Sequence, residues 1–289
     1  MKKCLKTLLS GIIPPEELPN IYNSYDIVGD IAIIRLTEKS RKYSQIIAET
    51  IMKVHKNVKT VLAQTSPVRG DYRLRKLEHI AGEKRTATIH KESGCLFSVD
   101  VDKCYFSPRL FYERMRVAKL VEDGETVVNM FAGVGCFSLV IAKHSKAAKI
   151  YSIDINPIAI QFMKENVRLN RAFGKVIPVE GDAKEIIQKM LQNVADRVLM
   201  PLPEKALEFL PYALLALKNG GGWIHYYDFE HASRREDAVE KVVSKVSKKL
   251  EEFGAKFEIP FGRIVRTTGP NWYQIVLDIK TLSHNVHAQ

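Results

Sequence analysis

From residue 108 onward the sequence alternates between short apolar runs and amphipathic helical patterns, and this alternation limits the possible folds more than any other feature. Apolar runs typical of buried strands lie at 126–131, 149–155, 175–182 and 196–200. Each is followed by a helical pattern, and these patterns lie at 136–145, 157–171, 184–193 and 204–217. A further strand pattern, a helix and a last strand follow at 221–229, 237–254 and 272–282. This succession predicts an α/β fold with a parallel, doubly wound sheet.

The first hundred residues have a different pattern. We expect a strand at 30–36, an amphipathic helix at 43–56, a strand at 60–64 and a hairpin formed by 86–90 and 95–101. Residues 1–104 therefore predict a small α+β domain, and residues 105–289 a larger catalytic domain of the doubly wound type. Ser107-Pro108 predicts the start of a helix, with Ser107 as its cap.

The charge of the chain favours a polyanionic partner. Lys and Arg outnumber Asp and Glu by 44 to 33, which gives a net charge of +11. Nucleic acid is the leading candidate, and a Lys-rich thermophilic surface is the alternative. There is no apolar run of about 18 residues, and two early prolines interrupt the start, so we expect a cytoplasmic protein without a membrane partner. The four scattered cysteines predict free thiols and no metal site.

A Gly-x-Gly turn stands between the first apolar strand of the larger domain and its helix. Gly133 and Gly135 permit a tight turn and close approach of the backbone to a ligand. Asp154 follows the next strand and Asp182 the third, so three loops at the carboxyl ends of parallel strands converge on one crevice. Each Asp taken singly is also typical of a helix cap. The loop lacks the third glycine of a dinucleotide site, which favours S-adenosyl-L-methionine as the cofactor.

Five segments carry a family resemblance, which extends from about Asp26 to Lys280: SPRLFYER, NMFAGVGCFSL, IDINPIAIQFMKENVRLN, ADRVLMPLP and GGWIHYY. In these the chain resembles the archaeal and eukaryotic tRNA (guanine-37-N1) methyltransferases. The resemblance implies a class I, Rossmann-like methyltransferase domain and a smaller N-terminal domain that helps to hold the anticodon stem-loop of tRNA. It also implies that the cofactor is bound by Phe131, Gly133, Gly135, Asp154 and Asp182. We expect the protein to act as a monomer.

The same resemblance assigns catalytic roles to two residues. Glu113, in the PRL-x-x-ER segment, matches the family's general base, and Arg73 matches an arginine that stabilises charge on guanine O6. Guanine N1 carries a proton at neutral pH, so a base is needed, and a carboxylate is suitable if partial burial raises its pKa. Arg109 and Arg114 of the same segment are expected to bind substrate. Without the resemblance, Glu113 and Arg114 could equally be solvated charges on a helix.

Two positions depart from the family pattern. Pro201-Leu202-Pro203 stands where the family usually has Asn-Leu-Pro, so the amide that would hold the target base is missing; we expect Pro201 and Pro203 to form a wall of the base pocket. Asn129 stands where the family often has Asp, near the amine of the cofactor. The identity of the target base is therefore less constrained than the reaction class.

Other functions remain open. The nearest is the wyosine-pathway transferase that moves the aminocarboxypropyl group of the same cofactor; methylation of an exocyclic amine and a non-catalytic RNA-binding protein with a relic cofactor fold are the others. Cytosine-5 methylation is disfavoured, because the loop after the fourth strand has no cysteine nucleophile. His225 and Tyr227 lie in a strand pattern, and we expect them to pack in the core.

Overall fold

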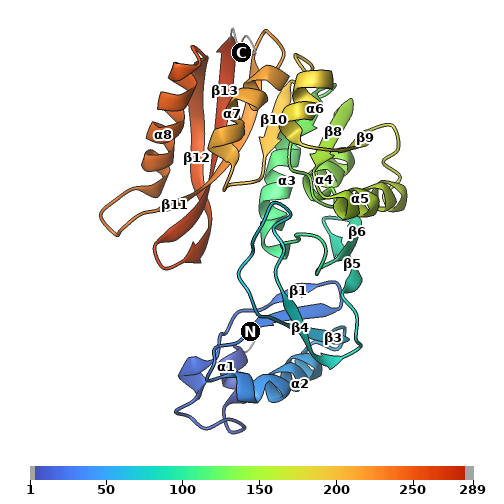
Figure 1. Cartoon of the computed structure of the whole chain (residues 1–289), viewed down its shortest axis with the longest axis vertical. Coiled ribbons are helices and arrows are strands. Elements are labelled where there is room, and N and C mark those ends of the chain that lie inside the picture. The colour runs from blue at the N-terminus through green and yellow to red at the C-terminus, as the bar shows by residue number, and fades with distance from the viewer. Residues whose placement is uncertain (1–3, 284–289) are drawn as a thin grey trace. The chain divides into compact units, whose positions relative to one another are not determined.

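The computed structural model describes residues 4–283, and the chain divides into two compact units, Met1–Phe111 and Tyr112–Gln289 (Figure 1). Each unit has a hydrophobic core of its own. None of the helices in the described part of the chain is long and apolar enough to cross a membrane.

The N-terminal unit is built on a four-stranded sheet of order β1-β2-β3-β4. Its strands are β1 (Asp26–Val28), β2 (Ile31–Arg35), β3 (Thr60–Gln64) and β4 (Leu77–Gly82). Helix α2 (Ser44–Val54) connects β2 to the parallel strand β3 and buries Ile47, Ala48 and Ile51. A separate hairpin is formed by β5 (Ala87–Glu92) and β6 (Cys95–Asp100), and short helices lie at α1 (Leu5–Leu9), η1 (Leu18–Asn20) and η2 (Arg41–Tyr43). The strands, the helix and the hairpin predicted for this unit are confirmed, whereas α1, β1 and β4 were not predicted.

The C-terminal unit contains a seven-stranded sheet of order β12-β13-β11-β10-β7-β8-β9. Its strands are β7 (Thr126–Asn129), β8 (Lys149–Asp154), β9 (Val176–Glu180), β10 (Arg197–Met200), β11 (Gly222–His231), β12 (Lys256–Gly269) and β13 (Trp272–Ser283). Strands β7 to β11 are parallel, and β13 runs antiparallel to both β11 and β12. The order reverses beside β7, which places the crevice of a doubly wound sheet at the end of that strand. The predicted fold class is confirmed.

Helices cover both faces of this sheet (Figure 1). They are α3 (Phe111–Leu120), α4 (Cys136–His144), α5 (Pro157–Leu169), α6 (Ala183–Met190), α7 (Ala206–Ala216) and α8 (Ala238–Glu252). Helices α6, α7 and α8 share one apolar core with alternate strand residues such as Val198, Met200 and Leu277. Helices α3, α4 and α5 lie on the opposite face. The turns that join β7, β8 and β9 to their helices therefore meet at one edge of the sheet.

Two details differ from the sequence prediction. The segment after Ser107 begins with a 3-10 helix, η3 (Pro108–Leu110); Ser107 is its N-cap residue and Pro108 its first residue, as predicted, but the side chain of Ser107 makes no capping hydrogen bond to it. Strand β12 was not predicted, because its residues alternate polar and apolar with a proline and two glycines among them. Its pairing with β13 contains several register shifts, which explains why the alternation is irregular.

Arg197 joins three elements of the C-terminal unit. It lies at the start of β10 and is almost fully buried. Its guanidinium donates to both carboxylate oxygens of Glu125, just before β7, at 2.7 and 2.8 Å, and to the carbonyl of Leu120, the last residue of α3, at 2.7 Å. The buried charge is paired and its donors are hydrogen-bonded. Removing one partner therefore costs far more unfolding free energy than removing one partner of an exposed ion pair.

Replacing Arg197 with alanine is expected to lower the free energy of unfolding by roughly 3–5 kcal/mol, since Glu125 would keep a buried charge without its partner. Urea denaturation followed by circular dichroism measures this loss. The control is Lys218→Ala, which removes an exposed ion pair with Asp196 and should change the free energy by less than about 1 kcal/mol. Equal effects of the two variants would contradict a stabilising role of the buried pair.

Candidate active site

The glycine turn after β7 has the backbone that its sequence predicts. Gly133 and Gly135 both have positive φ, at +56° and +91°. A Cβ added to Gly135 would lie 2.9 Å from Cγ of Met163, so a side chain there would meet both backbone strain and a packed helix. Gly135 is also the residue from which α4 begins. The turn therefore brings the backbone and the start of α4 to the edge of the sheet, with no side chain at either glycine position.

Asp154 ties this turn to the loop after β8. One carboxylate oxygen accepts a hydrogen bond from the backbone N–H of Gly133 at 2.6 Å, and the other accepts one from Asn156 at 2.9 Å. Burial raises the pKa of Asp154, and the two backbone hydrogen bonds only partly oppose this effect, so its pKa lies above the usual value. Each oxygen keeps a further lone pair, which suits a carboxylate that also accepts from a ligand hydroxyl.

A buried polar group lies at the end of β7. Asn129 is fully buried, and its Nδ2 donates to Oγ of Ser138 at 3.1 Å, which also accepts from Oγ of Ser152 at 2.7 Å. Oδ1 of Asn129 is buried and has no hydrogen-bond partner within residues 4–283. An acceptor in this condition fits a ligand that brings a donor, such as an ammonium group.

The other predicted cofactor residues occupy the same edge or support it. Asp182 caps α6, its carboxylate accepting from the N–H of Lys184 at 2.8 Å. Phe131 packs edge-on against Phe209, with ring centroids 5.1 Å apart. Pro201 and Pro203 follow β10 directly; Pro203 is buried and Pro201 half-buried. All of these residues belong to turns at the carboxyl ends of the parallel strands.

Glu113, the predicted base, is buried and strongly paired. The side chain is 1% exposed. It accepts hydrogen bonds from Arg116 at 2.7 to 3.1 Å, from the hydroxyl of Tyr227 at 2.8 Å and from Nη2 of Arg263 at 2.5 Å. Burial acts to raise the pKa of Glu113, but the hydrogen bonds and charge of Arg116, with those of Arg263 and Tyr227, outweigh it and hold the pKa below its usual value. The condition that burial should raise this pKa is therefore not met in the structure, because the arginines and Tyr227 act in the opposite direction.

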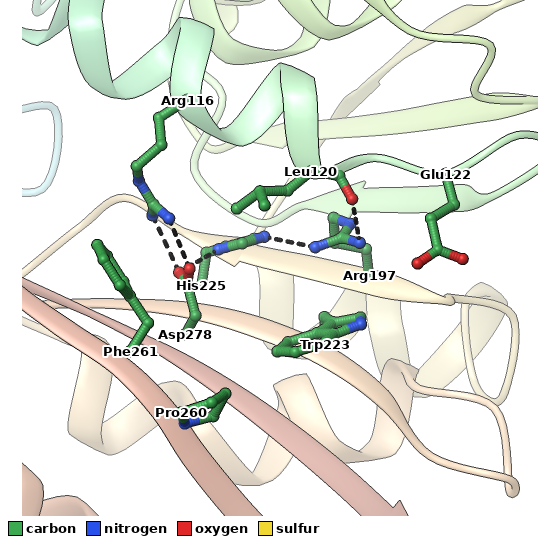
Figure 2. A pocket seen from close by; sticks show the side chains of 9 residues that line it. All are labelled: Arg116, Leu120, Glu122, Arg197, Trp223, His225, Pro260, Phe261 and Asp278. Carbon is green, nitrogen blue, oxygen red and sulfur yellow. Dashed lines mark hydrogen bonds and ion pairs between the residues drawn. The ribbon is translucent and has the colours of Figure 1, made fainter.

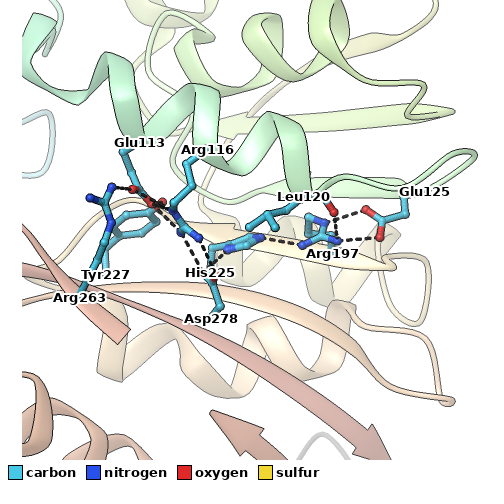
Figure 3. Close-up of polar contacts among 9 residues, drawn as sticks. All are labelled: Glu113, Arg116, Leu120, Glu125, Arg197, His225, Tyr227, Arg263 and Asp278. Carbon is cyan, nitrogen blue, oxygen red and sulfur yellow. Dashed lines mark hydrogen bonds and ion pairs between the residues drawn. The ribbon is translucent and has the colours of Figure 1, made fainter. Parts of the chain in front are cut away.

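The pairing of Glu113 continues as a chain of buried polar groups (Figure 3). Arg116 donates to both oxygens of Asp278, at 2.5 and 2.9 Å. Asp278 in turn bonds Nδ1 of His225 at 2.6 Å, and Nε2 of His225 lies 2.8 Å from Nη1 of Arg197. A guanidinium can only donate, so Nε2 accepts and the His225 proton is on Nδ1. Burial, aided by the nearby arginines, lowers the pKa of His225 despite Asp278, which agrees with a neutral ring.

A cavity of about 370 Å³ lies beside this chain (Figure 2). Trp223, Pro260 and Phe261 give it apolar walls, and Arg116 and Arg197 form part of its lining. The nitrogen atoms of these two arginines are hydrogen-bonded to the groups just described. The cavity therefore exposes the edge of a polar network that is already satisfied, and we assign it no ligand.

The remaining predicted residues have different surroundings. In the N-terminal unit, Arg73 has positive φ and its guanidinium stacks on the ring of Tyr105 at 4.1 Å. Arg109 forms an ion pair with Asp26 at 2.6 Å. In the C-terminal unit, Arg114 is buried, with its guanidinium 6.0 Å from the ring of Phe137. The structure thus brings together the predicted cofactor residues, while the predicted substrate residues are distributed over the two units.

Sequence reasoning missed the partners of Glu113. Arg116 lies three residues after Glu113 on the same helix, a spacing that places two side chains on one face and could have identified it. Asp278 interrupts the apolar run 275–279, and the register of β11 and β13 places it directly opposite His225. Tyr227 was expected in the core and is buried, but its hydroxyl contacts Glu113. Arg263 belongs to the strand that was not predicted.

The sheet order, the glycine turn tied to Asp154 and the orphaned Asn129 acceptor define a Rossmann-like domain of the methyltransferase class. Comparison with protein families agrees: residues 88–259 match the TRM5/TYW2 methyltransferase domain, and residues 5–86 match the TYW2 N-terminal domain. The chain belongs to the TRM5/TYW2 methyltransferase family, and the sequence-based recognition is confirmed.

Three similar proteins show the range of the family. The chain is 43% identical to tRNA (guanine(37)-N(1))-methyltransferase Trm5b of Pyrococcus abyssi, over 92% of this chain and 77% of that protein. It is 37% identical to tRNA 4-demethylwyosine(37)-methyltransferase Taw21 of Saccharolobus solfataricus, over 96% of this chain and 99% of that protein. The structure of a complex of aTrm5 and tRNALeu superposes with a TM-score of 0.83 at 38% identity, covering 97% of this chain and 78% of that one.

The pairing of Glu113 gives its contribution to stability a defined pH dependence. Because its folded-state pKa lies below the usual value of 4.5, the stabilisation is present above that value and is lost as the pH falls through the folded pKa. The difference in unfolding free energy between wild type and Glu113→Gln should therefore be largest near neutral pH and shrink in acid. Chemical denaturation over a pH series measures it.

The control for this series is Glu185→Gln, which changes an exposed carboxylate paired with Lys189 and should have a small effect at every pH. A difference between wild type and Glu113→Gln that grew as the pH fell would contradict the direction given for the pKa of Glu113.

Proposed function

We propose that this protein is a tRNA methyltransferase that transfers a methyl group from S-adenosyl-L-methionine to N1 of the guanine at tRNA position 37. Membership of the TRM5/TYW2 family supports the reaction class, and the Trm5b relative named for this activity supports the position. The observation that carries the proposal is the carboxylate of Asp154 bound to Gly133 beside the orphaned acceptor of Asn129, within this family's domain.

The residues at the edge of the sheet fit the cofactor. When bound, S-adenosyl-L-methionine supplies a methyl group activated by a positively charged sulfur. Asp154 would hold the ribose hydroxyls, and the turn of Gly133 and Gly135 would accommodate the backbone approach. Asn129 offers its unpartnered Oδ1 to the methionine amine, while Phe131 and Asp182 would border the remaining part of the cofactor.

Two further residues are proposed to act on the target base. Glu113 would accept the proton of guanine N1, so that N1 keeps the electron pair with which it attacks the methyl carbon; the bond from that carbon to sulfur breaks, and S-adenosyl-L-homocysteine is the leaving group. Arg73 stabilises the negative charge that develops on O6, a role suited to a guanidinium that keeps its charge. Arg109 and Arg114 are proposed to bind substrate, and Pro201 and Pro203 to shape the base pocket. The low pKa of Glu113 means that it is ionised, as a base must be, but also that its proton affinity is small in this state.

We propose different roles for the two parts of the chain. Residues 1–104 would contact the anticodon stem-loop and residues 105–289 would carry the methyl transfer. The net positive charge of +11 is suited to a tRNA partner. We also propose that the protein acts as a monomer in the cytoplasm.

A second candidate substrate is favoured by one specific residue. Pro201 stands where the family pattern has an asparagine, so the side-chain amide expected in the base pocket is missing. The Taw21 relative, which is named for methylation of 4-demethylwyosine, aligns with this chain over 99% of its own length. A tricyclic base derived from guanine could pack against prolines where an amide would otherwise bond. The aminocarboxypropyl transfer of the same pathway is the third possibility, because residues 5–86 match the TYW2 N-terminal domain.

The substrate is tested by incubating the purified protein with a tRNA transcript that has guanine at position 37, using cofactor labelled in the methyl group or in the carboxyl group. Methyl label on that guanine is expected. Carboxyl label would instead establish aminocarboxypropyl transfer. Methyl label only on tRNA that carries 4-demethylwyosine would support the second candidate and overturn the first.

The roles of Glu113 and Arg73 are tested by single-turnover kinetics. Glu113→Gln should slow the chemical step by about 10²–10⁴-fold, because general-base catalysis contributes an effect of this size. Arg73→Ala should slow the same step more than it weakens cofactor binding, which equilibrium dialysis measures separately. A full rate for Glu113→Gln at neutral pH would remove Glu113 from the mechanism, and the reverse result for Arg73 would place it outside the reaction.

A further inference from the structure

The carboxylate of Glu113 receives hydrogen bonds from three elements of the C-terminal unit, and the two arginines among them are held very differently. Arg116 comes from α3, Tyr227 from β11 and Arg263 from β12. Arg116 is fixed from behind by two hydrogen bonds to Asp278, and its side chain is 19% exposed. A guanidinium with this second partner is not easily withdrawn from Glu113.

Arg263 has no such anchor. Only its Nη2 reaches Glu113, and its buried Nε has no hydrogen-bond partner in the part of the chain that the structure describes. Its side chain is 39% exposed, about twice the value for Arg116. It belongs to the outermost strand of the sheet, whose pairing with β13 shifts register close to Arg263, between Ile264 and Arg266. Arg263 is therefore a cation at the surface with unused donors.

An arginine in this condition is suited to exchange one anion for another. Guanidinium groups bind carboxylates and phosphates with the same forked geometry, and a phosphate chain attracts arginines strongly at low salt. The exchange would also change Glu113, because a carboxylate that loses one of two arginine partners becomes a better proton acceptor.

We propose that Arg263 is a detachable counter-ion: it holds Glu113 ionised in the free protein, moves to an RNA phosphate when substrate binds, and leaves Glu113 ready to accept a proton. This inference rests on the proposed role of Glu113 as the base. Arg263 is thus a positioning residue that couples RNA binding to proton transfer. It resolves the conflict between a carboxylate that must accept a proton and a resting site that lowers its proton affinity.

The side chains bonded to Glu113 come from three elements of the C-terminal unit. They are Arg116 from α3, Tyr227 from β11 and Arg263 from β12, with Asp278 of β13 acting through Arg116. Burial, together with the charge of Glu113, raises the pKa of Tyr227 well above its usual value, so Tyr227 stays neutral and donates a hydrogen bond to Glu113. Loss of Arg263 from Glu113 is consequently the change that shifts the pKa of the carboxylate upward.

The pH dependence of the reaction tests this directly, because the second-order rate constant reports on the free enzyme and the saturated single-turnover rate on the complex. Each rate constant falls on the acid side of its pH profile, and this acid limb has a midpoint. In the wild type, the midpoint for the second-order rate constant (free enzyme) should lie about one pH unit below the midpoint for the saturated single-turnover rate (complex). In Arg263→Gln the two limbs should coincide, at the higher value. Arg263→Lys keeps the cation and should retain a separation.

The control is Arg266→Gln, which removes an equal charge from the same strand at a residue bonded to Gln274 instead of Glu113. It should leave both limbs where the wild type has them. Binding supplies an independent reading: Arg263→Gln should reduce the slope of log affinity against log salt by about 1, since one phosphate contact is lost.

Each result has a distinct meaning. Coincident limbs in the wild type, or a salt slope unchanged in Arg263→Gln, would overturn the counter-ion exchange while leaving the proposed function in place. A full single-turnover rate in Glu113→Gln would instead overturn the base assignment on which the inference rests. Separate limbs in the wild type that merge in Arg263→Gln, with a reduced salt slope, would support the exchange.

Discussion

The buried polar chain from Glu113 to Glu125 is the interaction on which the catalytic unit depends. It connects helix α3 to strands β10, β11 and β13 through Arg116, Asp278, His225 and Arg197, on the face of the sheet opposite the large apolar core. Apolar packing would hold the helix against the strands in many rotations. The charged groups of this chain, linked through the neutral ring of His225, accept only the rotation in which each charge meets its hydrogen-bond partner, because a buried charge without one is very costly. The orientation of Glu113 therefore follows from the whole chain of contacts.

The cofactor edge is built by a different principle. There the backbone carries the geometry, through the positive φ of Gly133 and Gly135, and a single carboxylate, that of Asp154, joins two neighbouring loops. The proposed cofactor site is thus fixed by short-range turns, whereas the proposed base is fixed by residues distant in the sequence. This difference explains which parts of the site can be found without a structure.

Sequence patterns predicted the parallel strands, the helices between them and the glycine turn with Asp154 and Asp182, because each of these signals is local. They did not predict β12, whose register shifts interrupt its alternation, and they placed the start of a helix correctly at Ser107 without predicting that it is a 3-10 helix whose cap makes no side-chain hydrogen bond. The pKa of Glu113 was also beyond sequence reasoning. Its direction follows mainly from Arg116, and also from Arg263, 150 residues away, and from Tyr227, which resembled an ordinary core residue. A resemblance could suggest that Glu113 is a base, but only coordinates reveal its partners.

The pairing of β11 with β13 has a consequence for how the C-terminal strands find their places. His225 and Asp278 stand opposite each other in this antiparallel pair, and their side chains point away from the apolar core shared with α7 and α8. A slip of one residue would turn Asp278 into that core and bring Leu277 or Ile279 against His225. The hydrogen bond between His225 and Asp278 therefore helps to fix the register: in a misaligned pairing the carboxylate of Asp278 would be buried without its partners, so electrostatics as well as shape selects the position of the final strand.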